Sequence, residues 1–524
     1  MTGEPYESPL PRAASTPEAA GPDRPGPAPA AAGRPDPGRS AAGQDGRRWL
    51  ILAVIGAAQL MVVLDATIVN IALPSAQRAL GFSATDRQWV ITAYALAFGG
   101  LLLVGGRLSD LLGRKRMFIA GLAGFAVASA AGGLAPDFAV LVIARAVQGT
   151  FGALLAPSAL ALLTTTFTEA RERGKALGIF TAIAGGGGAI GLLLGGVLTQ
   201  YLSWRWCLYV NIIFAAAALA GAIALIPGHR PSRGAAVDVP GTFLAAGGLV
   251  AIVYGLSEAS VRGWGGALTI GLLAGGVALL ALFVLVERRA AHPLLPLAVV
   301  TDRIRGASYL GAAVGGIGII GTFLLLTFYF QAVLGFSPVL AGAAFLPFIA
   351  GVIAGSSVVS NVALSRLGPK VIVPGGLLLA AAGTAWLTRI GPAGNYGLDV
   401  APALVLIGVG ASCAVVTAFT FGPAGARPSD TGVAAALVNS SNQIGGSIGA
   451  ALLNTIAASA AAAYVASHPA APGPAAATVH GAVTAFTVLA ALFAAGAVST
   501  GLLHPRRAVV SARSAQRPAA SIRP

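Results

Sequence analysis

The sequence predicts an all-α membrane protein that crosses the bilayer many times. Of its 524 residues, 56% are hydrophobic and only 10% are charged, and the mean hydropathy is +0.81. Soluble proteins usually carry about a quarter charged residues. Apolar runs of about 17 to 27 residues follow one another from Trp49 onward, and about 20 such residues suffice for a helix to span the membrane. A set of water-soluble domains is therefore excluded.

The apolar runs define fourteen predicted helices, each bounded by a short polar break. An even number of spans places both chain ends on the same side of the membrane. The predicted ranges are 49–73, 88–106, 117–135, 138–161, 176–199, 206–227, 240–257, 266–286, 306–331, 341–361, 371–388, 401–421, 433–460 and 479–502.

Lys and Arg concentrate in every second loop. If the N-terminus is cytoplasmic, the loops on that side hold sixteen of these residues and the loops on the other side hold five. Cytoplasmic loops of membrane proteins carry such an excess. The net charge of +15 thus follows from topology and from contact with anionic lipid headgroups. Binding to nucleic acid is not expected.

The two ends of the chain have the composition of tails. Residues 1–48 are rich in Pro, Ala and Gly, and their six Arg are balanced by six Asp or Glu. Such a segment cannot bury enough apolar surface to fold, and it lacks the apolar core of a signal peptide. We expect a disordered cytoplasmic tail over 1–48 and a basic cytoplasmic tail over 503–524.

A carboxylate lies inside the first predicted helix. The run from Trp49 to Pro74 carries one acidic residue, Asp65. A charged Asp near the centre of a membrane helix costs about 2.5–3.5 kcal/mol on insertion scales. Asp65 is therefore predicted to mark a functional site. The alternative is a polar group that hydrogen-bonds a neighbouring helix for packing.

A compact motif, GRLSDLLGRKRM, connects the second and third predicted helices. Its glycines allow the backbone to turn sharply, and one acidic residue stands among several basic ones. We expect this loop to act as a cytoplasmic gate, and the alternative is an ordinary basic loop. The residues concerned are Gly106, Asp110, Gly113, Arg114 and Arg116.

A weak echo of this motif occurs in the second half of the chain. The segment NVALSRLGPK, residues 361–370, aligns Gly368 with Gly113 and Lys370 with Lys115. It lies between the tenth and eleventh predicted helices, and Ser365 stands where the first loop has its acidic residue. Two halves related by an internal repeat are typical of transporters.

Together these motifs resemble those of a known family. The loop GRLSDLLGRKR is similar to the cytoplasmic loop motif of the major facilitator superfamily. The segment LDATIVNIALP resembles the first-helix signature of its fourteen-helix drug:proton antiporter family, and segments 141–157, 204–212, 331–347 and 431–449 resemble other signatures. The resemblance implies two six-helix bundles, at 49–227 and 306–502, with a linker at 228–305 that contributes two inserted membrane helices.

The fifth predicted helix resembles the antiporter motif of that family through the spacing of its glycines. Leu192 stands where many members have proline, so the kink that proline would impose is not implied. Small residues let membrane helices approach closely, which favours sliding at this interface. The glycines are Gly178, Gly187, Gly191, Gly195 and Gly196.

Arg145, in the fourth predicted helix, lies at the depth of Asp65. In the predicted topology each residue is about seven or eight positions from the outer end of its helix, or roughly 10–12 Å deep. The resemblance places the first and fourth helices in one bundle. We therefore predict that the two side chains interact, directly or through one polar group, and couple transport to protons. The alternative for Arg145 is a purely structural ion-pair partner.

Other polar residues within the predicted helices are candidates for the wall of a substrate cavity. Each of them has the alternative of a hydrogen bond that serves packing, so the prediction concerns the set. They are Gln59, Asn70, Tyr94, Gln148, Gln331, Asn439, Asn442 and Gln443.

The resemblance implies a secondary transporter, functional as a monomer and without cofactor or metal, that exports drugs or other amphipathic small molecules across the cell membrane in exchange for protons. A nucleotide-driven pump would need a G-x-x-x-x-G-K-[ST] loop, which the sequence lacks. A membrane enzyme would need clustered His, Asp or Glu, and the five His are scattered. Within transport, a dedicated exporter of one metabolite or self-made antibiotic, an importer and an uncoupled facilitator stay open. Because only one acidic residue lies deep, we expect neutral or amphipathic substrates.

Overall fold

The computed structural model describes residues 37–228, 238–290, 293, 295–359, 367–427, 430–468 and 473–504. Its contacts divide the chain into Met1–Gly46 and a second unit, Arg47–Pro524, which carries the helical bundles. Most of the two predicted tails lies outside the described residues.

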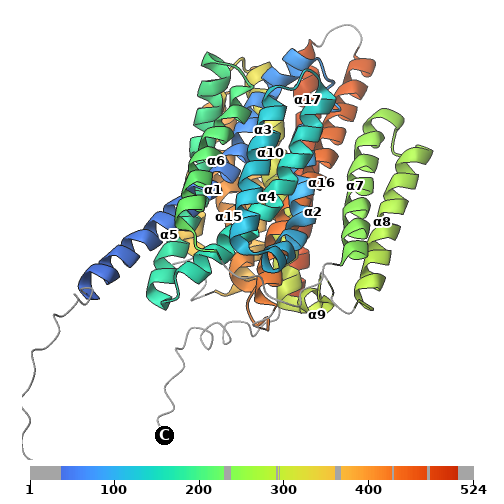
Figure 1. Cartoon of the computed structure of the whole chain (residues 1–524). Helices are drawn as coiled ribbons and strands as arrows, with labels where there is room; N and C mark the ends of the chain where they lie inside the picture. The colour runs from blue at the N-terminus through green and yellow to red at the C-terminus, as the bar shows by residue number, and fades with distance from the viewer. Residues whose placement is uncertain are drawn as a thin grey trace, which may run out of the picture. The chain divides into compact units, whose positions relative to one another are not determined.

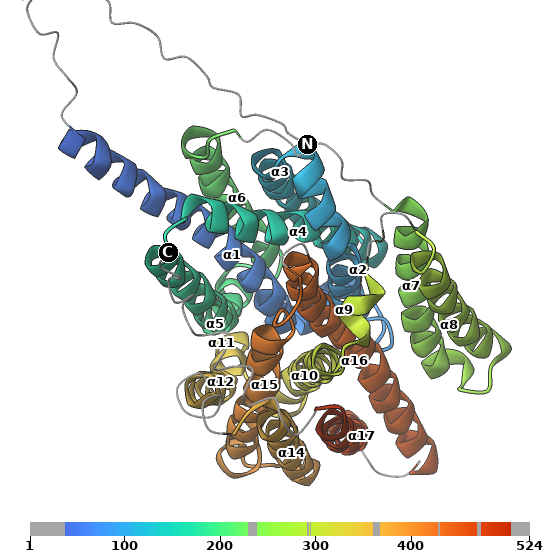
Figure 2. The same ribbon diagram turned by 90° about the horizontal axis from the view of Figure 1, so that it is seen from below.

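Six of the described helices form the first bundle, on one side of the view in Figure 2. Local capping starts α4, because the carboxylate of Asp137 accepts a hydrogen bond of 2.9 Å from the backbone N–H of Val140. The first helix begins earlier than predicted and includes residues 37–48, which we assigned to the tail. The six are α1 (Pro37–Leu80), α2 (Trp89–Leu112), α3 (Arg114–Gly133), α4 (Phe138–Thr166), α5 (Ala170–Tyr201) and α6 (Trp206–Leu225).

The second bundle lies beside the first, on the other side of the same view (Figure 2). The last turn of its first helix continues as a short π-helix, η1, a form that is frequent at functional sites. Its elements are α10 (Arg303–Phe328), η1 (Tyr329–Val333), α11 (Pro338–Ala343), α12 (Leu346–Val358), α14 (Pro369–Trp386), η3 (Leu387–Arg389), η4 (Tyr396–Val400), α15 (Ala401–Phe421), α16 (Thr431–Ser467) and α17 (Pro474–Leu503).

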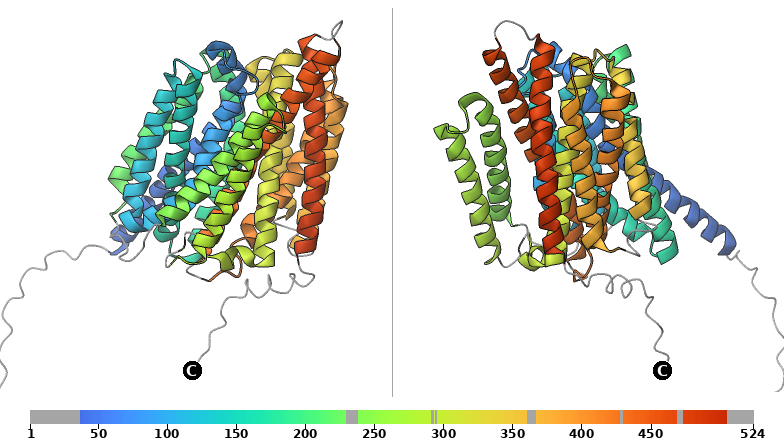
Figure 3. Two further views of the ribbon diagram at one scale, coloured as in Figure 1. Left: turned by 90° about the vertical axis from the view of Figure 1, so that its right-hand side faces the viewer. Right: turned by 180° about the vertical axis from the view of Figure 1, so that it is seen from behind.

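Two long helices and a short one separate the bundles in sequence. α7 (Val239–Arg262) and α8 (Ala267–Glu287) form an antiparallel hairpin at the side of the molecule (Figures 1 and 3), and α9 (Leu297–Thr301) follows. Asp238 caps α7 by accepting a hydrogen bond of 2.9 Å from the N–H of Gly241. α7 packs against α2 and α16, whereas the partner of α8 is α7.

The predicted fold class is confirmed. Among the described residues, thirteen helices are long and apolar enough to cross a membrane. The 32-residue α5 is not one of the thirteen, but it occupies the place of the predicted fifth span. Each of the fourteen predicted ranges overlaps a described helix, and the described part of the range 341–361 is divided between α11 and α12. The described part of the chain contains no strand.

The largest buried core lies in the second bundle. There Phe323 stacks on Phe345 with 4.4 Å between ring centroids, and Phe348 meets Phe323 edge-on at 5.1 Å. The same cluster includes Ile71 of α1 and Leu192 of α5. The first bundle has a core of its own, and a further cluster combines its side chains with Leu324 and Phe328 of α10 and Ala450 of α16. The two bundles therefore pack against each other in more than one region.

Candidate functional site

Asp65 and Arg145 form an ion pair inside the first bundle. Arg145 Nη1 on α4 donates to Asp65 Oδ2 on α1 at 2.7 Å. Asp65 is 0% exposed and Arg145 is 2% exposed. A buried ion pair of this kind needs further hydrogen bonds to offset the loss of hydration. We predicted an interaction that is direct or passes through one polar group, and in the structure the contact is direct.

Two amide side chains complete the bonding of the carboxylate. Gln148 Nε2 on α4 and Asn211 Nδ2 on α6 each donate to Asp65 Oδ1 at 2.7 Å. Both amides also donate to the hydroxyl of Ser129 on α3, at 2.8 and 3.4 Å. All three partners are completely buried. Four helices, α1, α3, α4 and α6, therefore meet around one carboxylate.

Arg145 is held from several directions. Its Nη1 also donates to Gln148 Oε1 at 2.6 Å, and its Nε donates to the carbonyl of Val90 at 3.1 Å. The guanidinium carbon lies 4.5 Å from the centroid of the Tyr94 ring, a cation–π contact. The hydroxyl of Tyr94 is buried and bonds to none of the described groups. Arg145 is thus fixed in position by both charge and aromatic contact.

The sequence prediction found only part of this cluster. Gln148 and Tyr94 were predicted to line a substrate cavity, but the structure places them beside Asp65. Asn211 and Ser129 were missed. A search for polar residues at matching depth in every helix of the bundle would have found Asn211, because it lies in the apolar run of α6.

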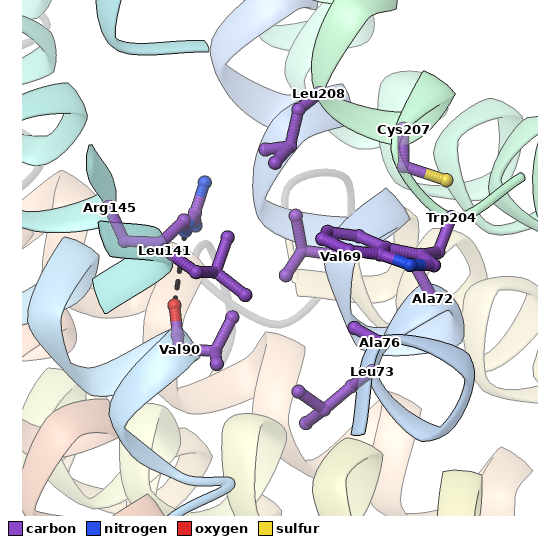
Figure 4. Close-up of a pocket in the computed structure, with 10 residues that line it drawn as sticks. All are labelled: Val69, Ala72, Leu73, Ala76, Val90, Leu141, Arg145, Trp204, Cys207 and Leu208. Atoms are coloured by element: carbon purple, nitrogen blue, oxygen red, sulfur yellow. Dashed lines mark hydrogen bonds between the residues drawn. The ribbon is translucent and has the colours of Figure 1, made fainter. Parts of the chain in front are cut away.

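A small pocket adjoins the cluster on the Arg145 side (Figure 4). Its walls come from α1, α2, α4 and α6 and from Trp204 just before α6, and they are mostly apolar, with Val69, Leu141 and Leu208 among them. Arg145 contributes the charged group of the lining, and its bond to the Val90 carbonyl crosses the edge of the pocket (Figure 4). Arg145 is thus part of the wall of a small, mostly apolar pocket.

The predicted loop motif joins α2 to α3 through Gly113, whose φ is 98°. Gly368, its counterpart in the echo, begins α14 with a φ of 71°. Residues other than glycine rarely adopt such angles. The side chain of Lys115 donates to the carbonyls of Ile223 and Ile226 at the end of α6, at 3.0 and 2.6 Å. The two aligned glycines thus have the same backbone role.

The other residues of the predicted loop motif lie in the helices on either side of Gly113. Gly106 is in α2, where an added Cβ would meet Pro157 at an ordinary 3.8 Å. Arg114 and Arg116 begin α3, and Arg116 is exposed. Asp110 belongs to α2, but its side chain lies outside the described part of the structure.

Most glycines of the predicted antiporter motif face α1. A Cβ at Gly187 would lie 3.1 Å from Leu60, one at Gly195 would lie 3.0 Å from Cα of Ile68, and one at Gly191 would collide with Thr67. Gly196 instead faces α11 of the second bundle, where an added Cβ would lie 2.7 Å from the carbonyl oxygen of Pro338. Gly178 has nothing within 4 Å. These contacts allow α5 to lie unusually close to α1.

A family model connects this geometry with known proteins. It is described as the Major Facilitator Superfamily, and it matches residues 55–450, from within α1 to within α16, which include most of both bundles and the inserted hairpin. The chain belongs to this superfamily. It is therefore a multi-pass membrane transporter of small molecules, as the sequence motifs indicated.

Curated relatives within the superfamily cover most of the chain. The puromycin resistance protein pur8 of Streptomyces alboniger is 53% identical over 456 residues, which is 87% of this chain and 90% of that protein. The cephamycin export protein CmcT of Amycolatopsis lactamdurans is 39% identical over 77% of this chain and 83% of its own length. The tetracenomycin C resistance and export protein of Streptomyces glaucescens is 36% identical over 80% and 78%.

Solved structures of superfamily transporters have the same fold. A bacterial homolog of the human lysosomal transporter Spinster, crystallised in an inward-facing and unoccupied conformation, matches with a TM-score of 0.62 and 16% identity, over 87% of this chain and 97% of that one. The POT family transporter PepTSo matches with a TM-score of 0.61 and 14% identity, over 90% and 99%. At these identities the likeness concerns the fold alone.

The remaining cavity candidates of this superfamily member are dispersed. Among them, Gln331 Nε2 in η1 donates to the carbonyl of Ile71 at 3.0 Å, and Asn442 Nδ2 in α16 donates to that of Ala312 at 3.1 Å. Asn70 Nδ2 bonds within α1, to the carbonyl of Ala66, at 2.8 Å. Gln443 lies against Gly99 of α2, while Gln59 and Asn439 are half-buried. The described side chains include no group of three His, Cys, Asp or Glu that could hold a metal ion.

Proposed function

We propose that this transporter exports antibiotic-like, amphipathic small molecules across the cell membrane in exchange for protons. The observation that carries the proposal is the Asp65 carboxylate, completely buried and bonded to Arg145, Gln148 and Asn211. The names of the relatives, which refer to resistance to or export of single antibiotics, support the substrate class.

The proposed orientation has both chain ends in the cytoplasm. The excess of Lys and Arg in alternate loops supports it. The turn between α1 and α2 then faces outward, and the connection between α2 and α3 at Gly113 faces the cytoplasm. We call the outward side the α1–α2 end of the molecule.

The bundles contact each other at the α1–α2 end. Gln331 of η1 bonds the carbonyl of Ile71 in α1 at 3.0 Å, and the N–H of Val339 in α11 donates to Gln200 of α5 at 3.2 Å. Gly196 approaches Pro338 in the same region. In the proposed orientation these contacts close the outer side, which corresponds to a state that receives substrate from the cytoplasm.

In the proposed cycle, the protonation of Asp65 controls which arrangement of the bundles is favoured. When the outer side opens, Asp65 takes up a proton, its charge is neutralised, and its hold on Arg145 weakens. The helices α1 and α4 are then free to repack, which favours the other arrangement of the bundles. Proton release toward the cytoplasm accompanies substrate binding, and the outer side then opens to release substrate.

Two further motifs are assigned supporting roles. The loop at Gly113, with Asp110, Arg114 and Arg116, is proposed as a cytoplasmic latch. The close approach of α5 to α1 at Gly191 and Gly195 is proposed as a surface on which the helices slide. We further propose that one copy of the chain is sufficient for transport.

A second candidate is a dedicated exporter of one antibiotic. The 53% identity to a protein named for resistance to puromycin favours a narrow substrate range. A panel of compounds tested for growth protection in cells with and without the protein separates the two. Protection against one compound class supports the dedicated exporter, and protection against unrelated classes supports the broad one.

The central experiment reconstitutes purified protein in liposomes and records pH changes while candidate antibiotics are added. In the wild type, each addition should evoke proton release, and Asp65→Asn should abolish it. If the wild type transports equally well with and without a proton gradient, proton exchange is wrong and an uncoupled facilitator takes its place.

A further inference from the structure

The inserted hairpin packs over the seam between the two bundles. An apolar cluster at this seam combines Leu96 of α2, Leu249, Val253 and Leu256 of α7, and Ala451 of α16. In Figure 2, α7 lies next to both α2 and α16, and α8 lies outside it. The hairpin therefore contacts both moving units and belongs to neither.

Hydrogen bonds connect α7 to each bundle at the α1–α2 end. Gln88 Nε2, immediately before α2, donates to Ser257 Oγ of α7 at 2.8 Å. Thr455 Oγ1 of α16 donates to the carbonyl of Leu256, the neighbouring residue on α7, at 2.9 Å. Gln88 and Thr455 are 0% exposed. One turn of α7 is thus bonded to the first bundle and to the second.

Asn454 joins the two bundles directly at the same level. Its Nδ2 donates to Gln88 Oε1 at 2.6 Å and to the carbonyl of Ala84 at 3.1 Å. Its Oδ1 accepts from Arg87 Nε at 2.6 Å. Gln88 therefore bonds Asn454 through its oxygen and Ser257 through its nitrogen. We call the connected groups Ser257, Gln88, Asn454 and Arg87 the polar joint.

The cation in the polar joint is bonded to a neutral amide. Arg87 also lies over the ring of Phe328 in α10, 3.8 Å from its centroid. Burial lowers the pKa of Arg87 to about 10, so it remains charged at neutral pH. A guanidinium on an amide and an aromatic ring is bound less tightly than one on a carboxylate. The polar joint therefore holds the two bundles together, but separating it costs less free energy than breaking an ion pair would.

From these contacts we propose that the α7–α8 hairpin is a strap that holds the α1–α2 end closed through the polar joint. Opening this end must break the bonds of Asn454 to Arg87 and Gln88, and either Gln88–Ser257 or Thr455–Leu256. Buried polar groups left without partners oppose that step. The strap thus sets the balance between the closed and open states, and this inference rests on the alternating access of the proposed function.

The test compares substitutions on the strap with one away from it. Spin labels are attached at Ala79 and Ala466, exposed positions near the α1–α2 end of each bundle, in a background in which Cys207 and Cys413 are replaced by Ser. Distances between the labels are measured in lipid discs. The variants are Ser257→Ala, Thr455→Val and Asn454→Leu, and the matched control is Thr500→Val. Thr500 is also completely buried, but its hydroxyl bonds only carbonyls of its own helix, α17.

We expect Ser257→Ala and Thr455→Val each to raise the ratio of long to short distances about fivefold, as the loss of one hydrogen bond predicts. Asn454→Leu should raise it further, and Thr500→Val should leave it unchanged. If Asn454→Leu opens the molecule while Ser257→Ala and Thr455→Val do not, the bundles are joined without the hairpin and the strap is wrong.

Measurements on the wild type show whether the strap proposal alone is wrong or whether the proposed transport cycle is wrong as well. Its labels should report two distances whose proportions change with pH and with added antibiotic. If a single distance persists under all conditions, alternating access itself is wrong. If two distances occur and Ser257→Ala leaves their proportions unchanged, only the strap is overturned. Ser257→Ala removes one oxygen at the edge of the hairpin, so its folding is checked simply by thermal unfolding.

Discussion

Arg145 and Gln148, three residues apart on α4, each donate to a different oxygen of the Asp65 carboxylate, and Arg145 also donates to the Gln148 side chain. One turn of a single helix therefore donates hydrogen bonds to both carboxylate oxygens. The arrangement makes each partner of Asp65 testable by substitution.

Removing the cation should destabilise the first bundle. Arg145→Ala leaves the Asp65 charge buried without its partner, and breaking such a pair costs about 3–5 kcal/mol. Thermal unfolding of the purified variant should show a large decrease in midpoint. The second substitution Asp65→Asn removes the buried charge and should restore much of the loss. If the double variant is as unstable as Arg145→Ala, the ion pair is not the cause.

The amide of Asn211 should matter through the charge of Asp65. Asn211→Leu removes one of the donors to Oδ1, and a hydrogen bond to a charged group contributes about 1.5–3 kcal/mol. Unfolding is measured for Asn211→Leu alone and in combination with Asp65→Asn, and the loss of stability should be larger while the carboxylate is present. Equal losses with and without the carboxylate would mean that Asn211 serves packing alone.

The glycines of α5 should differ according to what they face. Gly195→Ala would place a Cβ 3.0 Å from Cα of Ile68, where backbone must move, and overpacking costs about 1–3 kcal/mol. Gly178→Ala meets nothing within 4 Å and should be neutral or stabilise the helix by up to about 1 kcal/mol. Thermal unfolding of the two variants gives the comparison, and equal effects would refute the close approach.

His504, at the end of α17, should make stability depend on pH. Burial lowers its pKa, a hydrogen bond to the Thr500 carbonyl opposes this, and the charge of Lys370 adds to the lowering. Because the folded state holds the neutral imidazole, it is favoured above the pH at which the unfolded imidazole titrates, about 6.5, and loses this advantage as the pH falls through the lowered folded value. Wild-type unfolding midpoints should fall between pH 7.5 and 5.5, and His504→Gln should fall less. The same decrease in the variant would assign the effect to other groups.

The sequence predicted the membrane helices from apolar length. It predicted the interaction of Asp65 with Arg145 from their matching depth together with the family resemblance, which places their helices in one bundle. Depth could have identified Asn211 as a candidate, but the bonds that Asn211 and Ser129 make in this cluster depend on how each helix is rotated about its axis. Helix ends were also misplaced, as at α1, because polar residues can continue a helix beyond the membrane. The hydrogen bond of Ser257 depends on where α7 packs, which the hydrophobic pattern of the sequence does not indicate.

Gly113 and Gly368 also show what the sequence can and cannot predict. Their alignment was visible in a ten-residue echo, and the structure gives both a positive φ. The side chains around them differ, so the repeat predicts the turn but not the contacts that stabilise it.

The bonds at Asp65 also determine which cation can neutralise it. The side chains that bond the carboxylate directly, Arg145, Gln148 and Asn211, all present N–H groups to it. A hard metal ion requires several oxygen ligands around it, and here it would meet the positive ends of hydrogen-bond donors. A proton needs only one lone pair. In the proposed cycle we therefore expect a proton rather than a metal ion to neutralise Asp65, and a sodium gradient should not drive transport.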